Sequence, residues 1–203
     1  MSRAEPTQAL PLRGRVALVT GSTSGIGLAI ARRFASAGAS VALHGFGEAG
    51  ELRKLEEALG GIAHQPVRHC GGDLSDADAI ERLIAEVEKE FGRIDVLVNN
   101  AGIQHVSPLE SFPPERWNAI LAVNLSAPFH TTRLVLPLMR RQGWGRIVNI
   151  ASVSGLVAAP FKAAYTASKH GLVGLTKVTA LETATTAITC NAICPGWVLA
   201  PIA

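Results

Sequence analysis

Three side chains in the second half of the chain, Ser152, Tyr165 and Lys169, have the right chemistry to move a proton. Tyr165 is the only tyrosine in 203 residues, and Lys169 follows four positions later, so both would lie on one face of a helix. A phenol with a pKa of about 10 is a weak base at neutral pH, but a neighbouring ammonium group favours the phenolate. A Tyr and a Lys at this spacing are far more often a purely structural pair. Their position in the fold must therefore decide between the two interpretations.

A glycine-rich segment near the N-terminus is the second candidate. Residues 20–27 read Thr-Gly-Ser-Thr-Ser-Gly-Ile-Gly, with glycines at Gly21, Gly25 and Gly27. They follow an apolar segment and precede a helical pattern, where glycines let the backbone approach a pyrophosphate at a helix N-terminus. The spacing indicates nucleotide binding, and the alternative is an ordinary tight turn between strand and helix.

A short polar segment, Asn99-Asn100-Ala101-Gly102, directly follows a later apolar strand. It should lie at the same sheet edge as the glycine turn. The small residues would pack beneath an adenosine, and the amides would cross-link neighbouring loops or simply brace the strand ends.

The elements that must position these residues alternate regularly. Strands are predicted at residues 15–20, 40–44, 65–70, 94–98, 146–150 and 188–193, and helices at residues 26–37, 48–59, 76–90, 113–142 and 163–183. Ser75 and Asp78 resemble a capping box for the third helix. Such alternation predicts right-handed crossovers and an α/β fold, a doubly wound parallel sheet that binds ligands beyond the carboxyl ends of its strands.

Composition supports one domain. With 48% hydrophobic and 17% charged residues, we expect a polar leader at residues 1–12 and a single domain at residues 13–203. A net charge of +3 without long basic runs argues against a nucleic-acid partner, and no apolar run is long enough to span a membrane. Cys70, Cys190 and Cys194 are interpreted as reduced core residues of a cytoplasmic protein, with no metal site.

The six histidines show neither triad nor metal-ligand spacing, and we interpret them as structural or surface residues. They are His44, His64, His69, His105, His130 and His170, of which His105 beside Gln104 deserves separate consideration.

Taken together with Asn124 and Pro195-Gly196, these motifs resemble the short-chain dehydrogenase/reductase family over residues 14–201. The resemblance implies a Rossmann-type domain and a nicotinamide cofactor. It assigns acid–base chemistry to Tyr165, polarisation of the substrate oxygen to Ser152 and the nicotinamide ribose to Lys169. Asn124 would hold a water of the proton relay. The cofactor contacts that it implies are Gly21, Thr23, Ser24, Gly25, Ile26, Gly27, Phe46, Asp73, Leu74, Asn100, Ala101, Gly102, Tyr165, Lys169, Pro195, Gly196 and Val198.

Within the family, residues 99–105, 129–132, 143–146, 160–162 and 191–196 resemble D-3-hydroxybutyrate dehydrogenases. This implies oxidation of 3-hydroxybutyrate to acetoacetate with NAD, an activity of ketone body metabolism. Gln104 and Lys162 would hold the substrate carboxylate beside Ser152 and Tyr165, and Trp197 would line the pocket. Without the resemblance, Lys162 is equally well an exposed loop lysine and Gln104 a loop-bracing amide. Ser154 stands where those enzymes carry a histidine, which opens the possibility of another 3-hydroxy acid.

The choice between NAD and NADP depends on the end of the second strand. Residues 44–47, His-Gly-Phe-Gly, offer no Arg or Lys to a 2′-phosphate, and Ser24 is also uncharged, so NAD is favoured. The usual acidic residue for the ribose is absent as well. Asp73 is the candidate for the adenine, with a turn or helix-cap carboxylate as its alternative.

Members of the family continue well beyond Pro195-Gly196, whereas this sequence stops at Ala203. The resemblance then implies a sheet without its last strand and a site without its lid, with weak activity expected. The alternatives are a reductase of another 3-oxo substrate, or a cofactor-binding module that is inactive for want of that segment. The helix at residues 163–183 is the family's usual dimer surface, so a homo-oligomer, dimer or tetramer, is expected.

Overall fold

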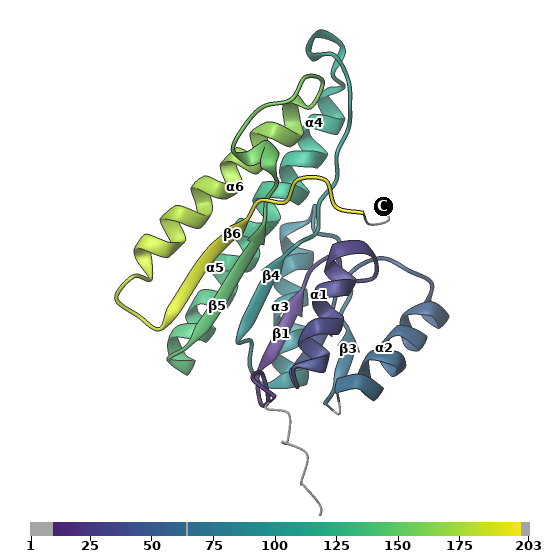
Figure 1. Cartoon of the computed structure of the whole chain (residues 1–203), viewed down its shortest axis with the longest axis vertical. Coiled ribbons are helices and arrows are strands. Elements are labelled where there is room, and N and C mark those ends of the chain that lie inside the picture. The colour runs from purple at the N-terminus through teal and green to yellow at the C-terminus, as the bar shows by residue number, and fades with distance from the viewer. Residues whose placement is uncertain (1–9, 64, 200–203) are drawn as a thin grey trace, which may run out of the picture.

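The computed structural model describes residues 10–63 and 65–199, which form one six-stranded parallel sheet. Its order is β3-β2-β1-β4-β5-β6 (Figure 1). The strands are β1 (Val16–Val19), β2 (Ser40–Leu43), β3 (Val67–His69), β4 (Val96–Asn99), β5 (Gly145–Ile150) and β6 (Ile188–Ile193). The order reverses between β1 and β4, where Val19 pairs with Val98, and this is the point at which ligands bind in doubly wound sheets. The predicted α/β Rossmann-type fold is confirmed.

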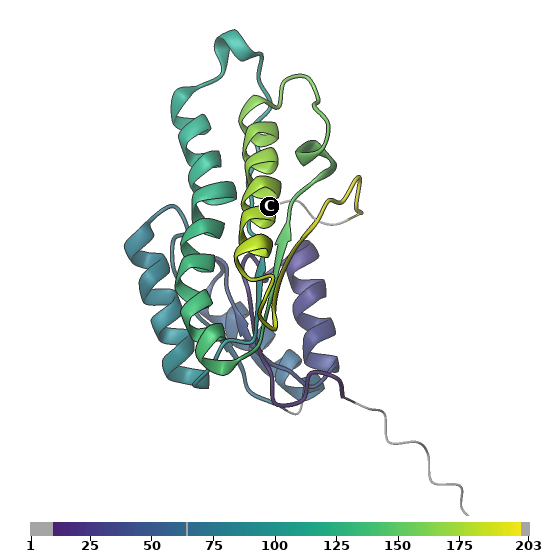
Figure 2. The same ribbon diagram turned by 90° about the vertical axis from the view of Figure 1, so that its left-hand side faces the viewer.

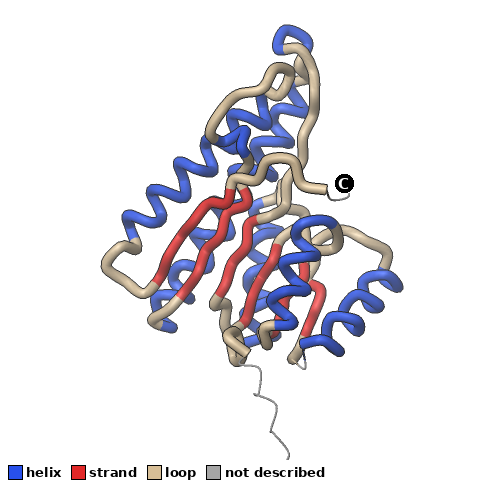
Figure 3. Tube along the Cα trace, in the orientation of Figure 1, coloured by secondary structure: helices blue, strands red, loops and turns tan. Residues whose placement is uncertain are grey.

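Helices cover both faces of the sheet (Figure 2). On one face lie α1 (Gly25–Ser36) and α2 (Ala49–Ala63); on the other lie α3 (Ala77–Phe91), α5 (Ala127–Gln142) and α6 (Ala163–Glu182). The short elements are α4 (Pro114–Leu121), the 3-10 turns η1 (Leu109–Ser111) and η3 (Val153–Gly155), and the π-helical η2 (Ala122–Ser126). Figure 3 shows that long loops gather at one end of the strands, above the sheet.

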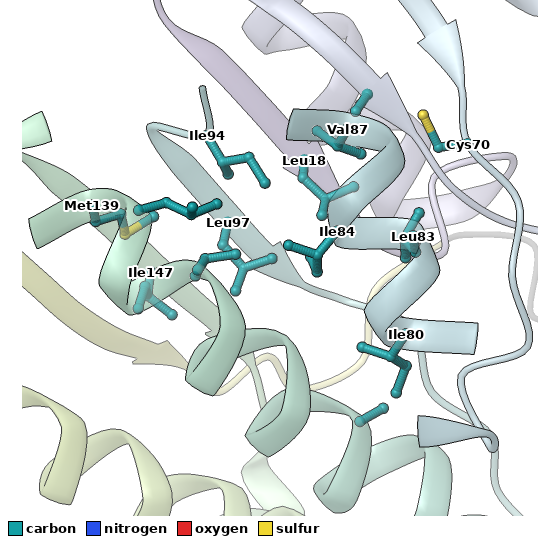
Figure 4. Packing of buried hydrophobic residues seen from close by; sticks show 14 of the residues in the cluster. Leu18, Cys70, Ile80, Leu83, Ile84, Val87, Ile94, Leu97, Met139 and Ile147 are labelled. Atoms are coloured by element: carbon teal, nitrogen blue, oxygen red, sulfur yellow. The ribbon is translucent and has the colours of Figure 1, made fainter. Parts of the chain in front are cut away.

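The largest core cluster lies between the sheet and the α3–α5 layer (Figure 4). Leu18 of β1 and Leu97 of β4 are fully buried there against Leu83 of α3 and Met139 of α5. Burial of side chains of this size contributes about 1.5–3 kcal/mol each, so the strands are held rigidly where their carboxyl ends carry the polar segments.

Three local expectations need adjustment. The predicted capping box is wrong, because Asp76 is the N-cap of α3 and accepts from Asp78 N–H, while Ser75 Oγ donates to Asp73. The helical stretch at residues 113–142 is present but contains the π-helical segment η2. Residues 1–9 of the predicted leader lie outside the described residues, and Leu12 already packs against the sheet, with its N–H donating to Ala37 O.

Asp95 anchors the amino-terminal ends of β1 and β4, opposite the loops. Its fully buried carboxylate accepts from Arg15 Nη1 at 2.8 Å, Val16 N–H at 2.9 Å and Arg93 at 2.6 and 2.7 Å. Burial alone would raise the pKa of Asp95, but the bonds from Arg93, Val16 and Arg15 outweigh it and hold the pKa below its usual range. Ionised Asp95 therefore stabilises the folded state. This contribution is fully present above the ordinary Asp pKa of about 3.9 and is lost as pH falls through the lowered pKa.

Replacing Asp95 with Asn should therefore lower the free energy of unfolding by about 2 kcal/mol at pH 7, because two arginines lose their shared anion. The Glu81→Gln change, which breaks an exposed pair with Arg133 at 2.9 Å, is the matched control and should cost less than about 0.5 kcal/mol. Urea unfolding at pH 7 and pH 3 measures the free energy of unfolding of both variants. An equal decrease in the two variants at pH 7 would contradict the anchoring role of Asp95.

Candidate active site

The glycine turn lies at the carboxyl end of β1, as predicted, and forms a glycine cradle at the start of α1. Gly21 and Gly25 have φ angles of 61° and 54°, a region that favours glycine. A Cβ on Gly21 would come within 2.9 Å of Ala101 Cα, and one on Gly27 would overlap Gly21 O. The first turn of α1 carries no acidic residue, so its unpaired N–H groups suit an anion.

Asn100 binds the glycine turn to the end of β4. Its Nδ2 donates to Thr20 O at 2.9 Å and to Gly21 O at 3.0 Å, and its N–H donates to Thr20 Oγ1 at 3.0 Å. Ala101 N–H also donates to Thr20 Oγ1, at 3.1 Å. These contacts favour the interpretation that the segment cross-links neighbouring loops. Thr20, which accepts three of these bonds, was not singled out from the sequence.

Ser152 lies just beyond β5, buried at the start of η3. Its Oγ accepts a hydrogen bond from Ser154 N–H at 3.1 Å. A hydroxyl has one hydrogen and two lone pairs, so this contact leaves the hydrogen free to donate toward a ligand. Ser154 is itself buried, and Val153 N–H donates to Pro195 O at 2.8 Å, which joins η3 to the segment after β6.

Tyr165 and Lys169 share one face of α6, beneath η3. Lys169 Nζ lies 5.6 Å from the centre of the Tyr165 ring and donates to Ile150 O at 2.8 Å. Burial lowers the pKa of Lys169 to about 8, so the ammonium form still predominates at pH 7. Gly155 packs against the backbone of Lys169, where a Cβ would come within 2.8 Å of its carbonyl oxygen. The predicted pairing of phenol and ammonium is present.

Asn124 lies in the π-helical segment η2 and is fully buried. Its Oδ1 accepts from Ile103 N–H at 2.9 Å, while its Nδ2 donates to Ile103 O at 2.9 Å and to Ser168 Oγ at 3.2 Å. The side chain thus holds the loop after β4 against α6, with one lone pair of Oδ1 left over. Gly102 lies between Asn124 and Lys169, since a Cβ there would be 3.3 Å from Oδ1 and 3.6 Å from Nζ.

A buried amide network joins the strands beneath the site, and sequence reasoning missed part of it. Asn99 Nδ2 donates to Asn149 Oδ1 at 2.8 Å, and Asn149 Nδ2 donates to Thr176 Oγ1 at 2.8 Å. Thr131 Oγ1 donates to Asn99 Oδ1 at 2.7 Å. Asn149 within the apolar strand at residues 146–150 was the signal that could have revealed this network, because a buried amide needs hydrogen-bond partners.

The proposed substrate residues lie in segments that follow the carboxyl ends of β4, β5 and β6. Lys162 Nζ stands 5.7 Å from the centre of the Trp197 ring, so two segments 35 positions apart meet there. Apart from this contact, the Trp197 side chain is almost fully exposed to solvent. Gln104 is also exposed. Phe161 has a φ of 63°, and its carbonyl accepts from Ser107 N–H at 3.0 Å, which links the segments that follow β4 and β5.

The remaining predicted residues lie around this centre. Leu74 is buried, whereas Phe46 and Val198 are largely exposed, and Gly196 lies in the exposed segment after β6. Asp73 Oδ1 accepts from Ser75 N–H and Oγ at 2.8 Å each, which holds the pKa of Asp73 below its usual value and matches the turn interpretation. Cys70 and Cys190 are buried, and Cys194 is only half-buried, so it is not a core residue as expected.

Two histidines predicted to be structural, His44 and His69, bind loop carbonyls near the glycine turn. His64 lies outside the described residues. Over residues 10–63 and 65–199, no helix is both long and apolar enough to cross a membrane.

Comparison with known proteins agrees with this arrangement. The short chain dehydrogenase family matches residues 15–203. The chain is 57% identical to D-beta-hydroxybutyrate dehydrogenase of Cupriavidus necator, covering 94% of this chain and 73% of that protein. It is 52% identical to the protein of the same name from Rhizobium meliloti, over 93% and 73%. The crystal structure of levodione reductase superposes with a TM-score of 0.88 at 37% identity, over 94% and 74% of the two chains. With the glycine cradle, Ser152 and the Tyr165–Lys169 pair in place, the chain belongs to the short chain dehydrogenase family and is an oxidoreductase.

Proposed function

We propose that the protein oxidises a small 3-hydroxy acid, 3-hydroxybutyrate to acetoacetate, with NAD as the hydride acceptor. The observation that carries the proposal is Lys162, a cation that lies 5.7 Å from the centre of the Trp197 ring and three residues before Tyr165 in the sequence. The identities of 57% and 52% to D-beta-hydroxybutyrate dehydrogenases support the same substrate class.

The cofactor site is assigned from the cradle outward. Gly21 and Gly27 let the turn pack closely against Ala101 and Asn100, and Asn100 fixes its shape by donating to Gly21 O. We assign the pyrophosphate to the start of α1, beside Gly25. The ranges 20–30 and 40–52 contain no Arg or Lys, which disfavours a 2′-phosphate and supports NAD. Phe46, Asp73 and Leu74 are assigned to the adenosine side, and Ala101, Gly102, Pro195, Gly196 and Val198 to the nicotinamide side, together with Thr23, Ser24 and Ile26 on the cradle.

The proton chemistry follows from three fixed contacts. Tyr165 takes the proton of the substrate hydroxyl during oxidation. Ser152 donates a hydrogen bond to the same substrate oxygen, because its own Oγ already accepts from Ser154 N–H and its hydroxyl hydrogen is free. Lys169 has one donor committed to Ile150 O and two free for the ribose hydroxyls and the phenolate. Asn124 offers its remaining lone pair to a relay water. When bound, the nicotinamide supplies the hydride acceptor.

The substrate carboxylate is assigned to Lys162 and Gln104, with Ser154 and Trp197 completing the pocket. Turnover is measured by the absorbance of the reduced cofactor, with D- and L-3-hydroxybutyrate, longer 3-hydroxy acids and simple secondary alcohols. Activity on simple alcohols without activity on 3-hydroxybutyrate would rule out the substrate assignment. A preference for NADPH and 3-oxo esters would instead favour a ketoacyl reductase, for which a 44% identical putative ketoacyl reductase of Streptomyces coelicolor is the motivating observation.

The Lys162→Met variant tests the carboxylate contact directly. Loss of a charge-assisted hydrogen bond should raise KM for 3-hydroxybutyrate by about 10- to 100-fold while kcat changes little. KM for the uncharged methyl ester should stay the same, and Lys89→Met, an exposed lysine on α3, should alter neither value. An equal rise of KM for acid and ester would show that Lys162 acts on the loop rather than on the carboxylate.

We also propose that the protein forms a homo-oligomer through α6, whose Val178 and Leu181 are exposed to 52% and 77%. Light scattering measures the assembly, and a monomer at micromolar concentration would contradict this assignment.

A further inference from the structure

His44, the residue that follows β2, is almost fully buried between the loops that end β1 and β3. Its Nε2 lies 2.9 Å from Gly72 O, and its Nδ1 lies 3.4 Å from Gly21 N. A carbonyl oxygen only accepts, so Nε2 must carry the hydrogen. In the neutral ring Nδ1 is then an acceptor, which matches the N–H of Gly21.

The backbone around the ring is joined to the glycine turn as well. Ser22 N–H donates to His44 O at 2.7 Å, and His44 N–H donates to Ser22 Oγ at 3.0 Å. Gly45, with a φ of 154°, leaves no space for a side chain, since a Cβ would come within 2.6 Å of Thr23 Oγ1. His69 Nε2 lies 2.7 Å from Gly45 O, so a second imidazole holds the same loop from β3.

The two ring contacts of His44 reach both ends of the adenosine half of the proposed site. Gly21 begins the turn assigned to the pyrophosphate, and Gly72 directly precedes Asp73, which is assigned to the adenine. One rigid ring thus sets the distance between these two loops. A shift of either loop would misplace groups that must bind one ligand together.

We propose that neutral His44 is a positioning residue for dinucleotide binding, holding the glycine turn and the Gly72–Asp73 loop in register. The inference rests on the proposed cofactor site. A doubly protonated ring would point a hydrogen from Nδ1 at Gly21 N–H, so the turn would lose its acceptor and gain a repulsive contact.

Acidification should therefore weaken cofactor binding. The groups around the ring determine the direction in which the pKa of His44 is shifted. Burial lowers the pKa of His44 below its ordinary value of 6.5. The hydrogen bond to Gly72 O raises the pKa, but by less than burial lowers it. The titratable groups that face it are His69 of β3, which also lowers the pKa of His44, and Asp73, which raises it; the range 20–30 that packs on the other side contains none. The ring is neutral at and above pH 6.5, and protonation occurs as pH falls below it.

The test measures the Kd of NAD by calorimetry from pH 5 to pH 8 for the full chain and three variants. His44→Asn keeps an acceptor near the Nδ1 position but cannot take up a proton, and His44→Phe keeps the ring shape without either contact. His69→Gln is the control that retains a donor toward Gly45 O. Thermal unfolding at each pH establishes that the variants are folded.

The wild-type protein should lose NAD affinity as pH falls below the pKa of His44, by at most about tenfold per pH unit, because one proton must be released on binding. His69→Gln removes a neighbour that lowers this pKa, so its affinity should fall in the same way, beginning at the same or a higher pH. His44→Asn should bind with near wild-type affinity at pH 8 and show a flat profile, and His44→Phe should bind at least about tenfold more weakly at every pH. An acid-sensitive His44→Asn, or wild-type affinity in His44→Phe, would overturn the inference. If His44→Phe does not fold, the comparison of wild type with His44→Asn decides. Wild-type protein that binds no NAD at any pH would instead overturn the proposed function.

Discussion

The Tyr165→Phe variant is expected to lose about 10³-fold in turnover while its Kd for NAD stays within about twofold, because only the proton-transfer group is removed. The ring remains beneath η3 and beside Lys169, which lies 5.6 Å from its centre, so packing is preserved. Steady-state assays give the loss in kcat, and calorimetry gives the cofactor affinity. Turnover comparable to wild type would exclude Tyr165 as the acid–base group.

The same variant has a spectroscopic control. Tyr165 is the only tyrosine in the chain, so the phenolate absorbance of the wild-type protein reports on this residue alone. Any phenolate absorbance of the wild-type protein should therefore be absent from Tyr165→Phe. A residual signal would show that the assay observes something other than the proposed base.

The Gly27→Ala variant should abolish measurable NAD binding, with a loss of at least about 100-fold, and should lower the free energy of unfolding by about 1–3 kcal/mol. A methyl group there would overlap Gly21 O and come within 2.5 Å of Asn100 Nδ2, so the turn must open or α1 must move away from the sheet. Either shift breaks the bonds from Asn100 to Thr20 O and Gly21 O that keep the cradle in shape.

The matched control for this prediction is Gly61→Ala, at an exposed position of α2 where an added Cβ meets nothing within 4 Å. It should leave NAD affinity unchanged and raise stability by up to about 1 kcal/mol, because alanine favours a helix over glycine. Calorimetry and urea unfolding compare the two variants. Normal NAD binding by Gly27→Ala would exclude the glycine turn as the pyrophosphate site.

The amino-acid sequence by itself determined the architecture and the edge of the sheet at which the site lies. Apolar strands alternating with amphipathic helices predict parallel strands joined by helical crossovers, so every strand presents its carboxyl end to the same side. Ser152 and the glycine turn lie at such ends, and Tyr165 and Lys169 lie one helical turn apart, so local periodicity was enough to predict their orientation. The family resemblance, confirmed over residues 15–203, assigned the chemistry.

Only the tertiary structure decided which side chains touch across long sequence separations. Asn124, in the π-helical segment η2, binds Ile103 and Ser168, which are 21 and 44 positions away. His44 reaches Gly21 and Gly72 only because β1, β2 and β3 are adjacent in the observed register. Such contacts depend on strand register and loop path together, and neither leaves a periodic signal in the sequence. For the same reason a capping pattern at Ser75 was misleading: the backbone turned one residue later, and Asp76 became the N-cap of α3.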